Sequence, residues 1–433
     1  MTESEPAAFR TDESCARALD AGDALARYRS LFHIPKRDDG SDVIYFCGNS
    51  LGLQPKSVRG SIEQELEDWA RLAVDAHFDG RTPWYSYHEV FRESGARLVG
   101  GRPGEVVYMN GLTVNLHLLM ISFYRPSRSR PCILMEDTAF PSDTYAARTQ
   151  IRLHGFDPEE ALLIGKPRPG EYSLRTEDLE SLIDREGDRI ALVLFGGVNY
   201  FTGQVFDIER IVRAARARGC VVGFDLAHAA GNVPLRLHDW GVDFAAWCTY
   251  KYLNGGPGSV AGAFVHQRHH RSASLPRLGG WWGNDPATRF RMHLNTEFVP
   301  VESAEAWQVS NPPILSLAAL KASLAIFDEV GMGALRAKSE RLTGYLAHLI
   351  DELGRDRAGS PRYEVITPRD PARRGCQLSI LVHDRPKDLF RALQAEGVVC
   401  DFREPNVVRV APVPLYNTFH EAWRFAQVLA RHG

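Results

Sequence analysis

Two charged side chains, Asp225 and Lys251, stand in apolar surroundings where an unpartnered charge is costly. Asp225 follows the apolar run at 221–224, and Lys251 lies among Trp, Tyr and Leu side chains at 247–253. Lysine is scarce in this chain, with only seven lysines among the 51 Lys and Arg residues, so a lysine in an apolar segment is unusual here. Each of the two charges therefore needs a partner.

This pair has the chemistry that pyridoxal phosphate requires. A lysine amine forms the Schiff base with this cofactor, and a carboxylate keeps the pyridine nitrogen protonated so that the ring accepts electrons. Asp225 and Lys251 each stand at or near the end of a predicted strand, and open α/β sheets bind ligands at the carboxyl ends of their strands. A buried salt bridge between the two side chains is the alternative explanation, since ion-pair networks often imitate functional sites.

Two turn segments add groups that the same cofactor needs. A glycine turn leads to Thr113 and to a helical run at 114–120, and backbone N–H groups at a helix start bind phosphate together with a nearby hydroxyl. Helix capping by Thr113 explains the same residues without a ligand. The turn that begins at Phe140 offers an aromatic face for stacking and a carboxylate at Asp143, although its composition is also that of an ordinary turn.

The elements that position these residues alternate between strands and helices. Short apolar runs predict strands over residues 132–135, 190–195, 221–224 and 261–266. Apolar residues at i, i+3, i+4 and i+7 predict a surface helix over 207–218, capped by Asp207 and ended by Gly219. This alternation predicts an α/β fold with a mainly parallel sheet between helices.

The length of 433 residues favours one large and one smaller domain. Residues 1–90 are expected to form an N-terminal helical segment with active-site loops, because the pattern from about residue 11 to residue 71 is helical with a break at 47–55. Residues 91–312 carry the alternating pattern and are expected to form the large cofactor-binding domain. After Pro312 and Pro313 this rhythm is lost, so residues 313–433 are expected to form a smaller α+β domain.

The composition excludes several classes of function. The net charge of −3 leaves no basic excess with which to bind a nucleic acid. No export signal is recognised at the N-terminus, and no apolar stretch is long enough to span a bilayer. The seven cysteines are scattered without a C-x-x-C pair, which disfavours a disulfide framework and a zinc site. We therefore expect a cytoplasmic protein with reduced thiols, no membrane partner and no metal.

Two further motifs carry less weight. The segment 256–261 fits G-x-G-x-x-A, but it leads into a predicted strand rather than a helix and is interpreted as a turn. His266, His269 and His270 are flanked by polar and arginine residues with no carboxylate nearby in the sequence, and are interpreted as part of a solvated loop.

The chain resembles the kynureninases, which belong to the fold type I enzymes that use pyridoxal phosphate. The resemblance runs from about residue 45 to residue 419 and covers most of the chain. Its motifs are YFCGNSLGL at 45–53, FPSD at 140–143, GFDLAH at 223–228, TYKYLN at 249–254, GWWG at 280–283, SNPP at 310–313 and RVAPVPLYN at 409–417. Together these segments are specific, and they imply the fold type I architecture with a large domain and a smaller C-terminal domain.

The resemblance implies a role for each residue that matches a family motif. Lys251 is the lysine that binds the cofactor, Asp225 is the partner of the pyridine nitrogen, and Phe140 stacks on the ring. The other cofactor contacts that it implies are Leu112, Thr113, Pro141, Ser142, Asp143, His228, Tyr250, Trp281 and Asn311. Arg409 matches the arginine that binds the substrate α-carboxylate, and its apolar neighbours predict that it is buried. The residues implied around the aromatic ring of the substrate are Ser50, His77, Trp84, Ser310 and Asn311.

The activity implied by the resemblance is hydrolytic cleavage of the Cβ–Cγ bond of L-kynurenine or 3-hydroxy-L-kynurenine. The products are L-alanine and anthranilate or 3-hydroxyanthranilate, in tryptophan catabolism and NAD biosynthesis. The freed amine of Lys251 removes the Cα proton, and Tyr250 is the candidate acid that protonates the β-carbon. His77 with the Ser310–Asn311 pair is similar to relatives that favour the 3-hydroxy substrate. The resemblance also implies a homodimer with its sites at the subunit interface.

One position departs from the family pattern. Where some relatives carry a hydroxyl residue for the cofactor, this chain has Gly196. We expect the backbone N–H groups of Gly196 and Gly197, or a water molecule, to replace that contact, because glycine permits close approach.

Two alternatives remain open from the sequence. A related enzyme such as a cysteine desulfurase would use Cys376 or Cys400 as its nucleophile, but both lie in predicted strands rather than on a loop. A regulator that binds pyridoxal phosphate without turnover would carry an appended DNA-binding domain, and none is recognised.

Overall fold

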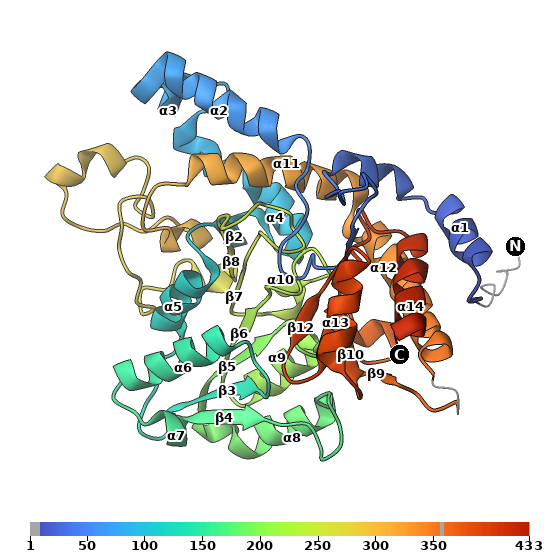
Figure 1. The fold of residues 1–433 in the computed structure, drawn as a ribbon. Helices are drawn as coiled ribbons and strands as arrows, with labels where there is room; N and C mark the ends of the chain where they lie inside the picture. The colour runs from blue at the N-terminus through green and yellow to red at the C-terminus, as the bar shows by residue number, and fades with distance from the viewer. Residues whose placement is uncertain (1–8, 356–358, 433) are drawn as a thin grey trace, which may run out of the picture. The chain divides into compact units, whose positions relative to one another are not determined.

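The structure, a computed structural model, describes residues 9–355 and 359–432 (Figure 1). The chain forms two compact units. Unit 1 comprises Met1–Lys56, Phe201–Gln204 and Gly333–Gly433, and unit 2 comprises Ser57–Tyr200 and Val205–Met332. The first residues of the chain, where no export signal is predicted, lie outside the described residues up to position 8.

Unit 2 is built on a seven-stranded sheet (Figure 1). Its strands are β2 (Val106–Tyr108), β3 (Cys132–Glu136), β4 (Leu162–Gly165), β5 (Ile190–Gly196), β6 (Val221–Asp225), β7 (Phe244–Trp247) and β8 (Gly262–Val265). Their order is β2-β8-β7-β6-β5-β3-β4, and β8 runs antiparallel to both of its neighbours while the other pairs are parallel. The predicted α/β fold with a mainly parallel sheet is confirmed, and each predicted strand is found within one or two residues of its expected place.

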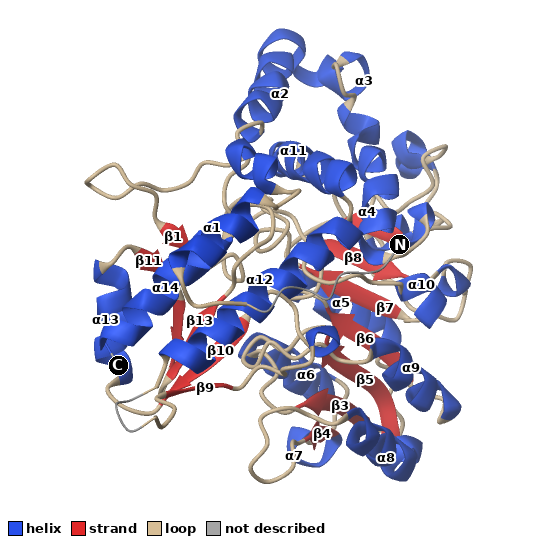
Figure 2. Cartoon of the chain, turned by 90° about the vertical axis from the view of Figure 1, so that its right-hand side faces the viewer, coloured by secondary structure: helices blue, strands red, loops and turns tan. Residues whose placement is uncertain are grey.

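Helices cover both faces of this sheet, which is why β3 and β7 are buried along their whole length. The helices of unit 2 are α2 (Val58–Leu72), η2 (Ala73–Asp75), α3 (Ala76–Asp79), η3 (Trp84–Phe91), α4 (Arg92–Val99), η4 (Pro103–Glu105), α5 (Leu112–Phe123), α6 (Pro141–Leu153), α7 (Pro158–Ala161), α8 (Thr176–Glu186), η5 (Gly187–Arg189), α9 (Ile208–Ala217), α10 (Leu237–Trp240), η6 (Gln267–His269), η7 (Arg289–Leu294), η8 (Ala304–Trp307) and α11 (Ile314–Val330). In Figure 2, α9 lies on one side of the strands and α5 and α6 lie on the other.

The predicted surface helix is α9. The side chain of Asp207 accepts a hydrogen bond from the backbone N–H of Arg210 at 3.0 Å, which satisfies one of the free donors at the helix start. Gly219 follows the helix with a φ of 68°, a conformation that favours glycine. The predicted cap and the predicted end are both confirmed.

Unit 1 holds two small sheets and four α-helices among its described residues. Its strands are β1 (Ile44–Tyr45), β9 (Tyr363–Val365), β10 (Leu378–Val382), β11 (Val398–Val399), β12 (Asp401–Arg403) and β13 (Val407–Val410), and its helices are α1 (Glu13–Ala21), η1 (Ala26–Leu31), α12 (Met332–Leu353), η9 (Pro371–Arg373), α13 (Pro386–Ala395) and α14 (Phe419–His432). The order β12-β13-β10-β9 forms an antiparallel sheet, and β1 pairs with β11 in parallel. Apolar side chains of this sheet and of α12 and α14 form one core.

The N-terminal region is less helical than predicted. Within the described residues up to position 72, only α1 and α2 are α-helices, and the chain between them forms η1, β1 and turns. Pro35, Gly40 and the aspartates around them favour turns, and these local preferences exceed the helical spacing of the apolar residues. The units also divide the chain differently from the predicted segments, because unit 2 extends to Met332 and includes α11.

Candidate active site

A cavity of about 310 Å³ lies in unit 2 at the carboxyl ends of the sheet strands. The predicted site residues that line it are Leu112, Thr113, Phe140, Ser142, Asp143, Asp225, His228, Tyr250 and Lys251. The remaining lining residues are Gly111, Val114, Ala227, Gly258 and Ser259. Small-molecule sites commonly have volumes of about 300–1,000 Å³, so this cavity has the size of a cofactor site.

Lys251 and Asp225 line this cavity without pairing with each other. The Nζ atom of Lys251 lies 3.0 Å from Nε2 of His228 and 5.7 Å from the centre of the Phe140 ring. Asp225 ends β6, and its Oδ1 accepts a hydrogen bond from the backbone N–H of Ala227 at 2.7 Å. Within the described residues no ion pair joins Asp225 to Lys251. The salt-bridge explanation of these two charges is therefore wrong.

The N-terminus of α5 forms one end of the cavity. Its N-cap residue is Gly111, without a side-chain hydrogen bond, so Thr113 is not a capping residue. The Oγ1 atom of Thr113 instead lies 3.1 Å from Oγ of Ser142, at the start of α6. The first N–H groups of a helix have no intrahelical partner and attract anions. These N–H groups and the two hydroxyls fit the phosphate of pyridoxal phosphate.

The turn at 256–261 contributes Gly258 and Ser259 to the same cavity. Its glycines have positive φ values, 97° at Gly256 and 66° at Gly258, and the chain then enters β8. The interpretation of this motif as a turn is confirmed. Its contribution to the cavity lining was not expected from the sequence.

Tyr200 is another residue near the cavity that the sequence did not indicate. Its ring packs edge to face against Phe140 at 5.2 Å, and it lies 6.5 Å from the ring of His228. Phe140 keeps 39 % of its surface exposed, so a face of its ring is free for stacking. The position of Tyr200 soon after β5, a strand whose end borders Asp225, is the signal that could have indicated it.

Three carboxyl groups stand close together in this part of unit 2. Burial raises the pKa of Asp143 well above its usual range, and the negative charge of Asp225 raises it further. The Oδ1 atom of Asp143 is buried without a hydrogen-bond partner among the described residues. Burial also raises the pKa of Glu136, at the end of β3, from 4.5 to about 7. Three carboxyl groups this close together favour the binding of a cation, such as a protonated pyridine ring.

The buried Glu136 gives the stability of the protein without cofactor a distinct pH dependence. Because the pKa of Glu136 is higher in the folded state, the folded state binds this proton more tightly, and stability is lost as pH rises from about 4.5 to about 7. Glu136→Gln keeps the acceptor oxygen but has no charge, so we expect its melting temperature at pH 8 to exceed that of the wild type by about 1–3 °C.

Thermal unfolding of the two proteins at pH 5 and pH 8 measures this effect. At pH 5 the difference should be smaller, because Glu136 is then protonated in the folded protein. The control is Glu160→Gln, which removes an exposed carboxylate from α7. A Glu136→Gln protein that is less stable than the wild type at both pH values would contradict the prediction.

The backbone N–H groups of Gly196 and Gly197 do not replace a phosphate contact, contrary to the first of the two expectations from the sequence. Its backbone N–H donates to Oε1 of Glu136 at 3.0 Å, and the N–H of Gly197 donates to the carbonyl of Asp225 at 2.7 Å. Both donors are therefore engaged within the protein. A Cβ atom at position 196 would lie 2.9 Å from Oε1 of Glu136, so glycine leaves room for this buried carboxyl group.

Tyr250 has the protonation state that an acid requires. Its hydroxyl is partly buried, and burial together with the neighbouring thiol of Cys248 raises its pKa above the usual value of 10. The phenol therefore keeps its proton throughout the neutral range and is able to donate it.

His77 and Trp84, two of the residues predicted around the substrate ring, contact each other in unit 2. Their rings pack edge to face at 5.3 Å. Nε1 of Trp84 donates to the buried carboxylate of Glu65 at 2.9 Å, which fixes the indole. Neither ring lines the cavity of Lys251 among the described residues.

Three other predicted residues lie in loops of unit 2. Trp281 packs against the ring of Trp282 at 4.8 Å, and Ser310 and Asn311 are exposed. In the part of the chain that the structure describes, none of these three predicted residues lines the cavity. Pro141, also predicted, is the first residue of α6, where its lack of an N–H costs nothing.

Two predicted residues, Ser50 and Arg409, belong to unit 1. Ser50 is exposed on the turn that follows β1, where its backbone N–H donates to the carbonyl of Cys47 at 2.9 Å. Arg409 lies on β13 and is only 1 % exposed. The predicted burial of this arginine is confirmed.

The histidines at 266–270 do not form a solvated loop. His266 and His270 are buried, and Nε2 of His269 lies 2.7 Å from the carboxylate of Asp243. His266 stands beside Glu105, whose oxygens already accept hydrogen bonds from the side chain of His238 and from backbone N–H groups. The prediction was wrong because these carboxylates are distant in sequence and reach the histidines only through the fold.

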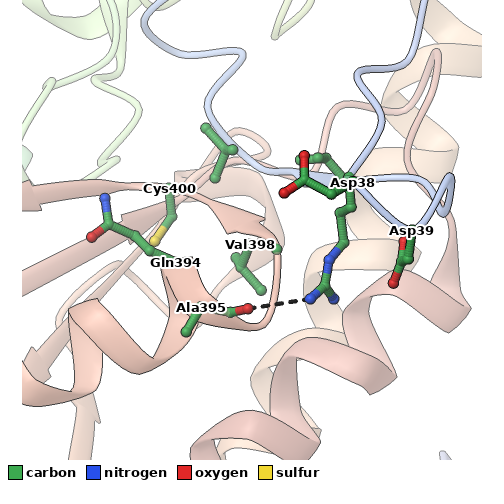
Figure 3. A pocket seen from close by; sticks show the side chains of 10 residues that line it. Asp38, Asp39, Gln394, Ala395, Val398 and Cys400 are labelled. Atoms are coloured by element: carbon green, nitrogen blue, oxygen red, sulfur yellow. Dashed lines mark hydrogen bonds between the residues drawn. The ribbon is translucent and has the colours of Figure 1, made fainter.

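The two cysteines of the desulfurase alternative are both buried in unit 1. Cys400 lines a separate cavity of about 520 Å³, together with Asp38, Asp39 and Val398 (Figure 3). Burial raises the pKa of the Cys400 thiol, so little of the reactive thiolate forms near neutral pH. The desulfurase alternative therefore lacks a suitable nucleophile at this position.

Solved structures of low sequence identity share this fold. One is a C-DES variant with glycine covalently linked to its PLP cofactor, with a TM-score of 0.77 and 16 % identity, covering 94 % of this chain and 99 % of the other. Another is the cysteine desulfurase CsdA from Escherichia coli, with a TM-score of 0.75 and 18 % identity, covering 94 % of this chain and 98 % of the other. The predicted fold type I architecture, with its large domain and smaller C-terminal domain, is confirmed.

Sequence comparison identifies the family. The family model "Kynureninase C-terminal domain" matches residues 335–429. A kynureninase from Koribacter versatilis is 56 % identical over 421 residues, which cover 97 % of this chain and 98 % of the relative. A kynureninase from Myxococcus xanthus is 55 % identical over 428 residues, which cover 99 % of both chains. With this agreement along nearly its whole length, the chain belongs to the kynureninase family.

Proposed function

We propose that this protein hydrolyses the Cβ–Cγ bond of L-kynurenine-type substrates with pyridoxal phosphate bound in the cavity of unit 2. The products are L-alanine and anthranilate, or 3-hydroxyanthranilate from the hydroxylated substrate. The observation that carries this proposal is the place of Lys251, whose Nζ lies 3.0 Å from His228 in a cavity that Asp225 and Thr113 also line. The full-length relatives named kynureninase support the same activity.

Different residues of the chain carry out different parts of the proposed reaction. Pyridoxal phosphate, when bound, supplies an electron-poor ring that stabilises negative charge at the substrate Cα. The Asp225 carboxylate, fixed by the N–H of Ala227, keeps a proton on the pyridine nitrogen. The Nζ atom of Lys251 removes the Cα proton, and the hydrogen bond to His228 holds this amine in place.

Cleavage itself needs a water molecule and an acid. Water adds to the γ-carbonyl of the substrate, and the Cβ–Cγ bond then breaks. Tyr250, whose raised pKa keeps its hydroxyl protonated, donates a proton to the β-carbon, and Nζ of Lys251 returns a proton to Cα to complete alanine. Arg409 binds the α-carboxylate of the substrate through its planar guanidinium group.

The direct test is to mix the purified holoenzyme with kynurenine and to record anthranilate fluorescence and alanine together. Equal amounts of the two products are expected. A protein that binds pyridoxal phosphate but forms neither product would overturn the proposed function and would restore the regulator alternative. A parallel assay with cysteine should release no sulfide.

We further propose that the group Ser50, His77, Trp84, Ser310 and Asn311 sets the choice between the two substrates. The contact between His77 and Trp84 supports a shared role for these two rings. His77→Phe removes a hydrogen-bonding partner for the 3-hydroxyl group but keeps an aromatic ring. We expect the ratio of kcat/KM for 3-hydroxykynurenine to that for kynurenine to fall about three- to tenfold, which is the scale of one hydrogen bond.

Measuring kcat/KM for both substrates with the same enzyme preparation checks this preference. The control is His154→Phe, which makes the same change at a partly exposed position elsewhere in unit 2 and should leave the ratio unchanged. If His77→Phe leaves the ratio where the wild type has it, His77 does not read the 3-hydroxyl group.

We also propose a homodimer in the cytoplasm. Large apolar side chains of unit 2 are exposed around α2 and α3, including Trp69 at 59 % and Val74 at 72 %. The exposed rings of Phe78 and Phe290 pack together at 6.2 Å in the same unit and add to this apolar surface. All seven cysteines are free thiols, as is usual in a reducing compartment. Sedimentation analysis is expected to give twice the mass of one chain.

A further inference from the structure

Asp401 and Arg409 lie side by side in the four-stranded sheet of unit 1. The strands β12 and β13 are antiparallel, and their register places Asp401 directly opposite Arg409, so that the two side chains share one face of the sheet. Arg403, two residues after Asp401, is on the same face. Val408 and Val410 point to the other face, where they belong to the core of unit 1.

The three charged groups meet at one oxygen atom. Oδ2 of Asp401 forms an ion pair with Nη2 of Arg409. The same oxygen accepts a hydrogen bond from Nε of Arg403 at 3.1 Å, and Nη2 of Arg403 lies 3.1 Å away as well. The side chain of Arg409 is 2 % exposed, whereas that of Asp401 is 19 % and that of Arg403 is 39 % exposed. Asp401 thus links a solvent-facing arginine to a buried one.

The burial of Arg409 determines the role of its ion pair with Asp401. A guanidinium group without water needs an opposite charge, and Asp401 supplies one on the neighbouring strand. The ion pair engages Nη2, a terminal nitrogen of Arg409. A second carboxylate binds a guanidinium best through two parallel N–H bonds, which requires the plane of the group to be set in advance. The contact at Nη2 restricts the orientations that this group can adopt.

We propose that Asp401 is a positioning residue that orients Arg409 for the α-carboxylate of the substrate. Through this contact the enzyme selects the amino-acid carboxylate over an uncharged amide in the same place. The proposal rests on the proposed function, in which Arg409 binds the substrate carboxylate. Asp401 itself needs no contact with the substrate.

The test compares kcat/KM for kynurenine with kcat/KM for its α-carboxamide, using holoenzyme. The ratio of the two values measures recognition of the carboxylate. Asp401→Asn keeps the size of the side chain but removes its charge, and we expect the ratio to fall at least about tenfold. Arg409→Gln should lower the ratio at least as far. Glu364→Gln, which removes an exposed carboxylate from β9 at the other edge of the same sheet, should leave the ratio unchanged.

The outcomes separate this proposal from the function on which it rests. A wild type that does not cleave kynurenine overturns the proposed function. A wild type that cleaves it, with an Asp401→Asn ratio within twofold of the wild-type ratio, overturns the positioning role alone. A merely structural defect would lower kcat/KM for both substrates by the same factor and also leave the ratio unchanged.

A second variant covers the case in which Asp401→Asn does not fold. Asp401→Glu retains the charge that Arg409 needs but moves the carboxylate by one methylene group. A ratio lowered threefold or more in this variant supports the positioning role, because the plane of Arg409 is then displaced. An unchanged ratio in the folded Asp401→Glu protein overturns it.

Discussion

Replacing Lys251 with alanine is expected to lower kcat for kynurenine by at least about four orders of magnitude, the scale of loss when a covalent catalytic group is removed. In the proposed mechanism this one amine both binds the cofactor and removes the Cα proton. In the described part of the chain no other lysine lines the cavity, so no second amine is placed to replace it. Anthranilate fluorescence measures the loss of activity.

The cofactor provides a readout that is independent of turnover. Borohydride reduction should attach pyridoxal phosphate to the wild-type chain at Lys251, and mass spectrometry should find no attachment in Lys251→Ala. The control is Lys166→Ala, which removes an exposed lysine after β4 in the same unit and should change neither readout. If Lys251→Ala retained more than about one hundredth of kcat, a different group would have to move the proton.

The strands around the site could be predicted because of how they are buried. β3, β5 and β7 have neighbours on both faces, so they appear in the sequence as unbroken apolar runs. Asp225 and Lys251 interrupt such apolar surroundings, and this made both charges recognisable. The secondary structure between α1 and α2 is harder to predict from the sequence. The spacing of its apolar residues indicates a helix, but its Pro, Gly and Asp residues form turns.

Contacts between distant segments were the part that the sequence did not reveal. Glu136 is followed by Asp137 and Thr138 and looks like the start of a surface turn, yet it is bonded to Gly196, 60 residues later in the chain. Its burial depends on the pairing of β3 with β5, which local sequence does not encode. Glu105 likewise lies beside His266 only because of the fold, so the local sequence does not predict the burial of this histidine.

For Arg409, the sequence predicts the burial of the side chain but not its ion pair. Its burial follows from the valines that flank it on β13. Its pairing with Asp401 depends on the register between β12 and β13, which is set by the turn that joins them. A shift of one residue would put the two charges on opposite faces of the sheet, so the spacing alone could not establish the ion pair.

Asp225→Asn is expected to reduce kcat by about a hundredfold to ten-thousandfold while leaving the fold intact. Asparagine has the same shape as aspartate. It also keeps an oxygen that can accept the hydrogen bond which the N–H of Ala227 donates to Oδ1 of Asp225 at 2.7 Å. It has no negative charge, however, and so cannot hold a proton on the pyridine nitrogen, and the ring then stabilises less charge at the substrate Cα. Steady-state kinetics with kynurenine measures the loss.

The neighbouring acids allow this electrostatic explanation to be separated from simple damage to the site. Burial is the main cause of the raised pKa values of Asp143 and Glu136, and the charge of Asp225 raises both further, so removal of this charge should lower both pKa values. In Asp225→Asn, the pH range over which the cofactor-free protein loses stability should therefore shift downward. This shift is measured independently of the loss of activity. Asp184→Asn, which removes an exposed carboxylate from α8, should alter neither kcat nor this pH dependence. A loss of kcat without any change in the pH dependence would mean that Asp225 acts through its shape and hydrogen bond rather than through its charge.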